Sequence, residues 1–395
     1  MITYKLRWFC LLLVVLILPR CHSQPEAEKA IELGCQQMEE YLPLIQNKKV
    51  GMLVNHTSLI EGVNLVDTLI SRGIQIQRIF APEHGFRGTA DAGEHIKAGI
   101  DTKTGTSIIS MYGKNKKPLP EQIRDLDVVI FDIQDVGVRF YTYISSMHYM
   151  MEACAENDVK FIVLDRPNPN GDYFDGPILK EKYKSFVGMH PIPIVHGLTV
   201  GELATMINQE GWLSAGRKCD LTVVKVNNYS HQMPYSLPVK PSPNLPNDLS
   251  IRLYPSLCFF EATEVSVGRG TYKPFQIIGY PDSIFGTFVF TPRSIEGMSK
   301  NPIQLDKVCY GMDLRDIETV NHRFTLKYLL DFYNKPGYRD QLVTRERWFN
   351  LLAGTGQLLK QIKLGATEAE IRSTWTLELS EYKLLREKYL LYPLQ

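Results

Sequence analysis

Acidic side chains stand at the ends of several apolar runs of the chain, and they are the residues best suited to do chemistry. Glu83 follows the run 76–80. Asp132 and Asp135 stand at the end of the run 128–133. Two carboxyl groups can cleave a glycosidic bond when one donates a proton to the leaving oxygen and the other acts on water or on the anomeric carbon. Partial burial beside an apolar strand would favour a protonated side chain, so Glu83 is the best candidate for the acid.

The second carboxylate is left open, because a sequence gives no distances between side chains. Four acidic residues compete for this role, namely Asp91, Glu94, Asp132 and Asp135. Aromatic side chains in the same stretch would offer apolar faces to a sugar ring; they are Tyr112, Phe140, Tyr141 and Tyr143. The combination favours a glycosidase.

Other chemistries lack their sequence signatures. Gly85 and Gly88 do not form the GxGxxG pattern of a dinucleotide site, and no Walker loop occurs, so no cofactor is expected. The chain also lacks the GxSxG elbow of a serine hydrolase. Four side chains could be imagined around a metal, namely His84, Asp91, Glu94 and His95. Their spacing matches no familiar metal-binding motif, so no metal is predicted. A metal-dependent hydrolase remains a third hypothesis. With 44 basic and 43 acidic residues the formal charge is +1, which makes nucleic acid an unsuitable partner.

The elements that must position these side chains alternate along the first part of the chain. Apolar runs predict strands at residues 50–54, 76–80, 107–111, 128–133 and 161–164, and helical patterns predict helices at residues 59–72, 121–126, 145–157 and 201–212. Thr199 and Glu202 predict a capping box at the start of the last helix. Because this alternation is typical of a mainly parallel sheet, we expect residues 34–227 to form one open α/β domain with its ligand beyond the carboxyl ends of the strands.

The second part of the chain is less regular. Pro, Asn and Ser are frequent between residues 227 and 247, which predicts a linker or an elaborate loop. Short runs at residues 257–260, 276–279 and 287–291 predict strands, and residues 345–391 return to helical periodicity. We therefore predict a second, smaller, β-rich auxiliary domain over residues 248–395 that ends in C-terminal helices.

The N-terminus has the pattern of a secretory signal. Lys5 and Arg7 precede the apolar run 8–18, and cleavage after Ser23 would give a signal peptide of residues 1–23. Lipidation at Cys21 is the alternative, although Arg20 fits that pattern poorly. We expect an exported, periplasmic protein whose mature chain has no membrane span. The five cysteines beyond residue 23 form no CxxC pair and are expected to be buried thiols.

Seven strings of the chain carry a resemblance to a known family. In order, they are GMLVNHTSL, FAPEHGFRG, DAGE, VVIFDIQDVGVRFYTYI, VLDRPNP, VHGLTVGELA and FFEATEVSVGRGTYKPF. With these strings the chain resembles the exo-β-N-acetylmuramidase NamZ family, which is glycoside hydrolase family 171. Several of the strings are long, and the match runs from about Gly51 into the C-terminal region.

The resemblance implies an exported enzyme of peptidoglycan recycling, which removes N-acetylmuramic acid from the non-reducing end of MurNAc-GlcNAc and other muropeptide-derived fragments. It also implies a Rossmann-like domain, a smaller β-rich domain and an active site in the cleft between them. Glu83 is then the catalytic candidate, with His84, Asp132 and Asp135 beside it. The matching strings supply the predicted substrate-binding residues: Asn55, His56, Glu94, Arg139, Tyr141, Asp165, Arg166, His196, Glu264 and Arg269.

The substrate adds a physical requirement. Muramic acid carries a lactyl carboxylate, which a guanidinium can bind through two hydrogen bonds, and Arg139, Arg166 and Arg269 are the candidates. An exported protein that binds a sugar or muropeptide in its cleft without catalysis is the second hypothesis. Whether the anomeric configuration is retained or inverted depends on the distance between the carboxyl groups, which the sequence leaves open.

Overall fold

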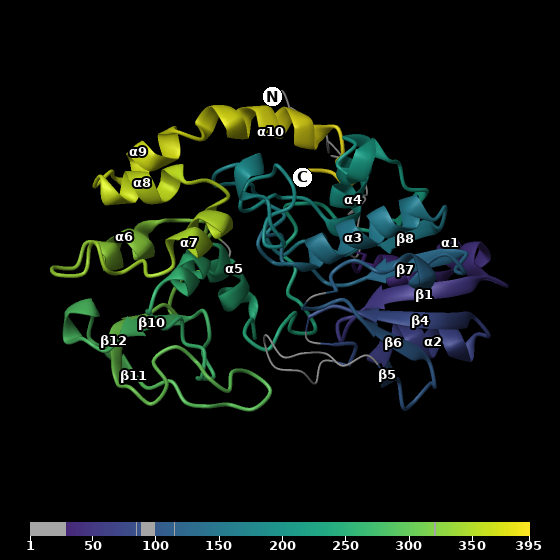
Figure 1. Cartoon of the computed structure of the whole chain (residues 1–395), viewed down its shortest axis with the longest axis horizontal. Coiled ribbons are helices and arrows are strands. Elements are labelled where there is room, and N and C mark those ends of the chain that lie inside the picture. The colour runs from purple at the N-terminus through teal and green to yellow at the C-terminus, as the bar shows by residue number, and fades with distance from the viewer. Residues whose placement is uncertain (1–28, 84, 88–98, 114, 320) are drawn as a thin grey trace, which may run out of the picture. The chain divides into compact units, whose positions relative to one another are not determined.

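A seven-stranded sheet lies at the centre of the fold, and its strands arise from the apolar runs of the sequence. The strand order is β5-β6-β4-β1-β7-β8-β9 (Figure 1). The strands are β1 (Lys49–Val54), β4 (Gln75–Ala81), β5 (Gly99–Ile100), β6 (Ser107–Ser110), β7 (Val128–Asp132), β8 (Lys160–Leu164) and β9 (Leu221–Val224). All neighbours are parallel except β5 and β6. The predicted Rossmann-like, mainly parallel sheet is confirmed.

Structural facts are given for part of the chain. The computed structural model describes residues 29–83, 85–87, 99–113, 115–319 and 321–395. Residues 1–23, His84, Asp91, Glu94 and His95, for which the sequence makes predictions, lie outside the described residues. The predicted division into domains of residues 34–227 and 248–395 stays a prediction.

The order of the strands places a switch point at the middle of the sheet. From β1 the chain adds β4 and then β6 on one side, and it returns to add β7, β8 and β9 on the other side. Open α/β sheets bind their ligands beyond the carboxyl ends of the strands at such a point. The loops that follow β4, β6 and β7 are therefore the place to look for a site.

The sheet is covered on both faces, which explains why its strands are almost continuously apolar. On one face Leu53 and Phe131 pack into a cluster that includes α3 (Tyr143–Glu156) and α4 (Val200–Gln209). On the other face Met52 and Val54 pack against side chains of α1 (Met38–Ile45) and α2 (Leu65–Ser71). The predicted capping box of Thr199 and Glu202 opens α4.

One predicted crossover helix is shorter than expected, and another is wrong. Of residues 59–72, the last part forms α2, but the first part forms the hairpin strands β2 (Leu59–Ile60) and β3 (Val63–Asn64), because Glu61 and Gly62 adopt left-handed φ angles of 51° and 80° that turn the chain. The helix predicted at residues 121–126 is wrong, because they contain only the end of a 3₁₀ helix, Pro120–Gln122.

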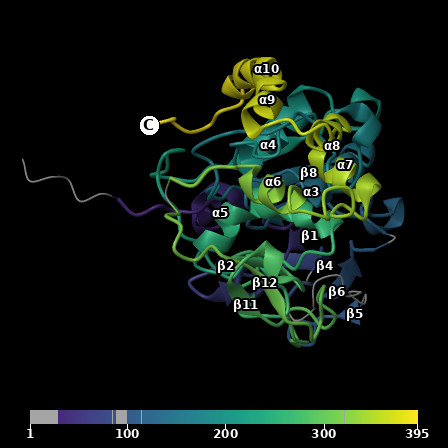
Figure 2. The same cartoon turned by 90° about the vertical axis from the view of Figure 1, so that its left-hand side faces the viewer.

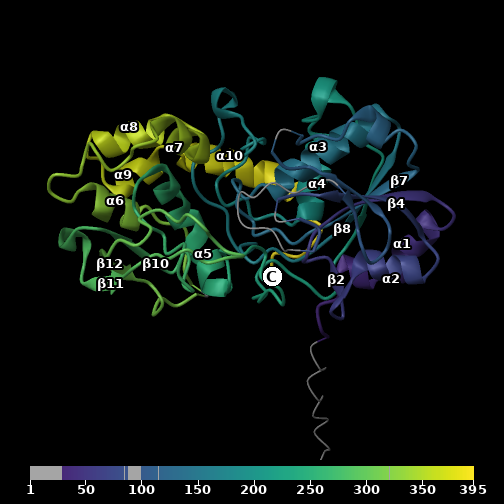
Figure 3. The same ribbon diagram turned by 60° about the horizontal axis from the view of Figure 1, so that its bottom comes forward.

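A small antiparallel sheet forms in the second part of the chain. It consists of β10 (Ile277–Tyr280), β12 (Cys309–Asp313) and β11 (Phe288–Phe290), in this order (green in Figure 3). The strands predicted at 276–279 and 287–291 are confirmed. The strand predicted at 257–260 is wrong, because these residues end α5 (Asp248–Leu257) and continue as a 3₁₀ helix, Cys258–Ala262. A short apolar run does not distinguish a buried helix from a strand.

Helices complete the chain, as predicted. They are α6 (Lys327–Tyr333), α7 (Glu346–Ala353), α8 (Gln357–Lys363), α9 (Glu368–Ser373) and α10 (Thr376–Glu387) (Figure 2). The five described cysteines are free and buried, as expected from their spacing; they are Cys35, Cys154, Cys219, Cys258 and Cys309. Within the described residues no helix is both long enough and apolar enough to cross a membrane.

Candidate active site

A pocket of about 600 Å³ opens where β4, β6 and β7 end. The first part of the chain lines it with residues that follow these strands, namely Glu83, Tyr112, Gly113, Lys116, Phe140, Tyr141, Thr142 and Tyr143. Ser185, Phe186 and Val187, from the segment between β8 and α4, also line it. The second part lines it with Ser242, Asn244, Leu245, Tyr254, Glu261, Arg269, Phe275 and Trp348. A pocket with a few polar groups among aromatic rings has the size and composition of a small-molecule site.

Glu83 lies in this pocket among tyrosines. It is half-buried, and its carboxylate interacts with Tyr112, whose pKa is raised to about 12 by burial and by the charge and hydrogen bond of Glu83. The hydroxyl of Tyr143 donates to the carbonyl oxygen of Glu83 at 3.4 Å, and burial, followed by the charge of Glu83, raises the pKa of Tyr143. Both tyrosines are therefore neutral donors at ordinary pH. They hold the strand-end segment that carries Glu83.

The opposite part of the lining holds a second carboxylate and a guanidinium. Nη2 of Arg269 donates to Oε1 of Glu261 at 2.6 Å, and the guanidinium lies 5.2 Å from the centre of the Phe275 ring. Burial lowers the pKa of Arg269, but Glu261 outweighs burial, so the pKa is raised. Arg269 is thus a permanent cation whose position is set by an anion and an aromatic face.

Glu261 was missed in the sequence, where Glu264 was chosen instead. Glu264 is exposed, lies outside the pocket lining and accepts a hydrogen bond from Oγ1 of Thr344 at 3.2 Å. Both glutamates belong to the string FFEATEVSVGRGTYKPF, so the string itself was a signal. The 3₁₀ helix Cys258–Ala262 brings Glu261, rather than Glu264, to the pocket.

Several predicted residues lie beneath the pocket as part of the scaffold. Nε and Nη2 of Arg166 donate to the two oxygens of Asp132 at 2.6 and 2.9 Å, and both side chains are buried. Asp165 accepts hydrogen bonds from Thr199 and Tyr392 at 2.7 and 2.5 Å. None of these side chains lines the pocket. Because these side chains are already hydrogen-bonded to one another or to Thr199 and Tyr392, they are engaged within the protein rather than with a substrate.

Asn55, His56, Asp135 and His196 also lie outside the pocket lining. Oδ1 of Asn55 accepts from the backbone of Thr57 at 2.9 Å, and Nε2 of His56 lies 2.9 Å from the carbonyl oxygen of Lys240. Asp135 accepts from the backbone of Gly137 at 2.7 Å and lies 3.7 Å from Nε2 of the buried His196. These contacts shape the loops that follow β1 and β7.

Arg139 is the largest fully buried side chain of the described residues, and it too is engaged with the scaffold. Its Nη1 donates to the carbonyl oxygens of Pro177 and Ile192 at 2.8 and 2.7 Å, and its Nη2 donates to those of Leu352 and Ala353 at 3.0 and 2.8 Å. Burial lowers the pKa of Arg139 to about 9, so it is still charged at neutral pH. The structure does not bring it to the pocket.

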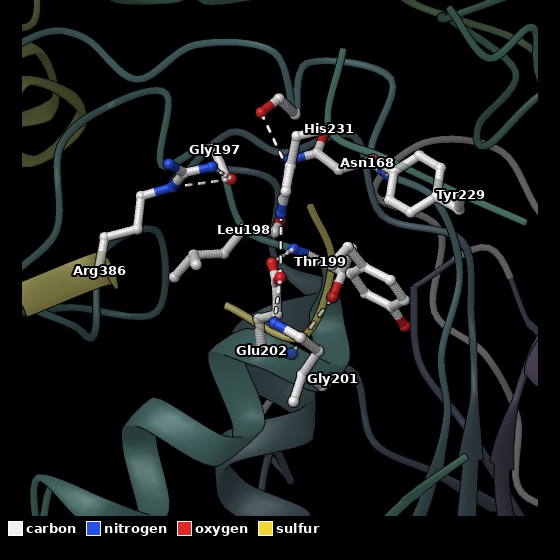
Figure 4. A network of polar contacts seen from close by, with 12 residues as sticks. Asn168, Gly197, Leu198, Thr199, Gly201, Glu202, Tyr229, His231 and Arg386 are labelled. Carbon is white, nitrogen blue, oxygen red and sulfur yellow. Dashed lines mark hydrogen bonds and ion pairs between the residues drawn. The ribbon is translucent and has the colours of Figure 1, made fainter. Parts of the chain in front are cut away.

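A buried polar network connects the C-terminal residues to the loop before α4 (Figure 4). Glu202 accepts from His231 at 2.9 Å and from the backbone of Leu391 at 2.8 Å. Arg386, on α10, donates to the carbonyl oxygen of Gly197, as Figure 4 shows. Buried polar groups therefore hold the tail against the α/β part of the chain.

The pocket thus combines features that suit one kind of chemistry. Among the described residues its carboxylates are Glu83 and Glu261, its cations are Arg269 and Lys116, and aromatic rings make up much of the remaining surface. Among the described residues no three His, Cys, Asp or Glu side chains cluster as a metal would require. Proton transfer to a glycosidic oxygen, with a sugar ring against the aromatic side chains, is what this arrangement can perform.

Comparison with known protein families gives two matches that together cover most of the chain. The model described as exo-beta-N-acetylmuramidase NamZ, N-terminal, matches residues 50–249. The model described as exo-beta-N-acetylmuramidase NamZ, C-terminal, matches residues 252–392. The boundary between the two matched regions lies in the first half of α5.

Individual proteins are similar over nearly their whole length. The peptidoglycan beta-N-acetylmuramidase NamZ of Bacillus subtilis (strain 168) is 37% identical over 404 aligned residues, which cover 95% of this chain and 94% of that protein. Crystal structures of two DUF1343 family proteins from Bacteroides fragilis NCTC 9343 are also similar. The TM-scores are 0.85 and 0.80 at 45% and 28% identity, and each comparison covers 92% of this chain and 99% of the other.

The buried guanidinium of Arg139 gives a test of the scaffold. We expect the substitution Arg139→Met to lower the free energy of unfolding by roughly 3–5 kcal/mol, because it leaves four carbonyl oxygens without their donor. Urea denaturation followed by tryptophan fluorescence measures this loss. Arg345→Met is the matched control, since Arg345 is exposed and donates to the carbonyl oxygen of Thr263, and it should cost less than about 1 kcal/mol. Equal losses for the two variants would contradict the role of Arg139.

Proposed function

The chain belongs to the exo-β-N-acetylmuramidase NamZ family, and on this premise we propose that its pocket removes N-acetylmuramic acid from the non-reducing end of peptidoglycan fragments. The observation that carries the proposal is the position of Glu83, which lies at the end of β4 in a pocket lined by tyrosines and by a second carboxylate. As an enzyme of this family the protein is a glycoside hydrolase, and its substrate derives from peptidoglycan.

Glu83 is the proton donor in this proposal. It gives its proton to the glycosidic oxygen as the bond to the anomeric carbon breaks, and water adds to that carbon. Among the described residues Glu261 is the second carboxylate of the lining, whereas neither Asp132 nor Asp135 lines the pocket. We therefore prefer Glu261 over both aspartates as the group that balances charge or receives the proton from water.

Arg269 is the residue that we assign to the lactyl carboxylate of muramic acid. Of the three guanidinium groups considered from the sequence, only that of Arg269 lines the pocket. Arg139 donates to four carbonyl oxygens and Arg166 donates to Asp132, so neither is available for a ligand. A guanidinium also matches the planar geometry of a carboxylate better than an ammonium group does.

The substrates are expected to be MurNAc-GlcNAc and other muropeptide-derived fragments, in the course of cell-wall turnover. An exo-acting enzyme needs a pocket that fits one terminal sugar, and the volume of about 600 Å³ is in this range. We propose in addition that the protein is exported to the periplasm. The basic residues Lys5 and Arg7 before the apolar run 8–18 support a signal peptide of residues 1–23.

Replacing Glu83 tests the catalytic assignment. We expect Glu83→Gln to lower the rate of hydrolysis of a chromogenic N-acetylmuramic acid β-glycoside by roughly 10²–10⁴-fold, because the amide has no proton to donate in the transition state. The exposed Glu121 offers a matched control, and Glu121→Gln should keep its activity. Binding of the glycoside by wild-type protein without any turnover would favour the non-catalytic binding protein instead.

Replacing Arg269 tests the selectivity for muramic acid. The variant Arg269→Met should reduce the preference for the N-acetylmuramic acid glycoside over the N-acetylglucosamine glycoside by about 10- to 100-fold, since a charge-assisted hydrogen bond to the lactyl group is lost. The ratio of kcat/KM for the two glycosides measures it. Arg293→Met, at an exposed arginine that pairs with Asp306, should leave the ratio as it is. An equal loss of kcat/KM on both glycosides would show that Arg269 does not recognise the lactyl group.

The N-terminus of the exported protein tests the localisation. Expression of the full chain in a Gram-negative host, followed by N-terminal sequencing of the soluble periplasmic fraction, should give a mature protein that begins at Gln24. Lipidation would instead give a membrane-bound protein that begins at a modified Cys21, and a cytoplasmic protein with an intact N-terminus would reject export altogether.

A further inference from the structure

Asn244 lines the pocket and has an amide oxygen that is buried without a hydrogen-bond partner among the described residues. The residue is 2% exposed and lines the pocket. Its Nδ2 donates to the carbonyl oxygen of Met298 at 3.0 Å. Its Oδ1 has no partner within the described part of the chain. Buried polar atoms are nearly always paired in proteins, so an unpaired one in a pocket points to a ligand atom.

The contact with Met298 decides which end of the amide faces the ligand. Nitrogen and oxygen of an amide are similar in size, and their assignment follows from the hydrogen bonds that they make. A carbonyl oxygen can be approached by the NH₂ group, whereas two oxygens would repel each other. The NH₂ group of Asn244 is therefore bound to Met298, and Oδ1 is left as a pure acceptor. The missing partner must be a donor.

The segment that carries Asn244 is held in place from several sides. Residues 242–245 form a turn in which the backbone nitrogen of Leu245 donates to the carbonyl oxygen of Ser242 at 3.2 Å. The hydroxyl of Tyr141 donates to the carbonyl oxygen of Pro241 at 2.8 Å. His56 contacts the carbonyl oxygen of the residue before it, Lys240, at 2.9 Å. Because these contacts fix the turn, the acceptor is positioned before any ligand arrives.

Apolar side chains make up part of the pocket that Asn244 lines. Leu245 is its neighbour in the chain, and Phe140, Tyr254 and Phe275 form a packed group. The ring of Tyr254 contacts those of Phe140 and Phe275 edge to face, at centroid distances of 5.3 and 5.0 Å. A ligand group that suits this part of the pocket has a hydrogen-bond donor and a small apolar end. An acetamido group has both, as an N–H and a methyl group.

We propose that Asn244 is a specificity-determining residue whose Oδ1 accepts the N–H of the 2-acetamido group of the terminal sugar, with the acetyl methyl group against the apolar side chains of the lining. This assignment rests on the proposed function and extends it. Arg269 distinguishes muramic acid by its lactyl group, and Asn244 distinguishes an N-acetylated sugar by its amide. The lactyl group and the acetamido group of the same sugar are thus recognised by two different segments of the second part of the chain.

One atom of the substrate tests the assignment. The aryl β-glycoside of N-acetylmuramic acid is compared with its 2-O-acetyl analogue, in which an ester oxygen replaces the N–H and the methyl and carbonyl groups remain. The preference is the ratio of kcat/KM for the amide to kcat/KM for the ester. This ratio should be larger for the wild-type protein than for Asn244→Ala. We expect the preference of the variant to be at least about 10-fold smaller, because the variant has no acceptor to satisfy. Any difference in intrinsic reactivity of the two substrates cancels in this comparison.

Asn350 provides a matched control. Its Oδ1 is also buried without a hydrogen-bond partner among the described residues, but it lies outside the pocket lining. Asn350→Ala should leave the preference for amide over ester within about two-fold of the wild-type value. A loss of preference in Asn350→Ala but not in Asn244→Ala would overturn the proposal. So would equal losses on both substrates in Asn244→Ala.

A second measurement needs no folded variant. The free sugars, N-acetylmuramic acid and its 2-O-acetyl analogue, are compared as inhibitors of the wild-type protein, and the proposal requires the amide to bind about 10-fold more tightly. Equal inhibition constants would overturn it. Asn244→Leu, of similar volume, replaces Asn244→Ala if the latter fails to fold. If wild-type protein hydrolyses the amide substrate while these comparisons fail, Asn244 is rejected and the proposed function is retained.

Discussion

The buried guanidinium of Arg139 connects the segments on which the pocket depends. It directly precedes Phe140 and Tyr141, which line the pocket, and it binds the last carbonyl oxygens of α7, the helix that carries the lining residue Trp348. Gly354, just after α7, has a φ of 73°, and a Cβ there would lie 2.6 Å from Nη2 of Arg139. Only a glycine permits this approach, so the helix end and the guanidinium depend on each other.

The division between scaffold and chemistry follows from burial. The polar residues nearest the strands, such as Asp132, Asp165 and Arg166, are buried and must satisfy one another, because an unpaired charge in the interior is costly. The residues of the loops beyond them, such as Glu83 and Arg269, are partly exposed in the pocket and can bind a ligand. The polar strand ends of the sequence therefore indicated the edge of the sheet at which the pocket opens, but most of these strand-end residues lie outside its lining.

Local patterns predicted much of the fold and part of the site. The five apolar runs became strands of one sheet, and Thr199 with Glu202 opened α4 as a capping box, since these features depend on neighbouring residues alone. The hairpin before α2 was missed, because the helical spacing of its apolar residues does not show that Glu61 and Gly62 adopt left-handed φ angles and turn the chain. Glu83 and the tyrosines, which were predicted from their place after strands, line the pocket. Glu261 and Asn244 also line it but were not predicted, because nothing in their local sequence shows which way their side chains face.

The sequence by itself determined the family, the parallel sheet and the edge of that sheet at which the pocket opens, because motifs and periodicity are properties of short segments. Only the tertiary structure decided which charged groups remain available to a ligand. Arg139 reaches Ala353 across 214 residues, and Arg166 reaches Asp132 across 34. Hydrogen bonds over such separations hold a side chain in the scaffold, yet they leave no trace in the spacing of residues. The role of each arginine was therefore settled by its partners in space.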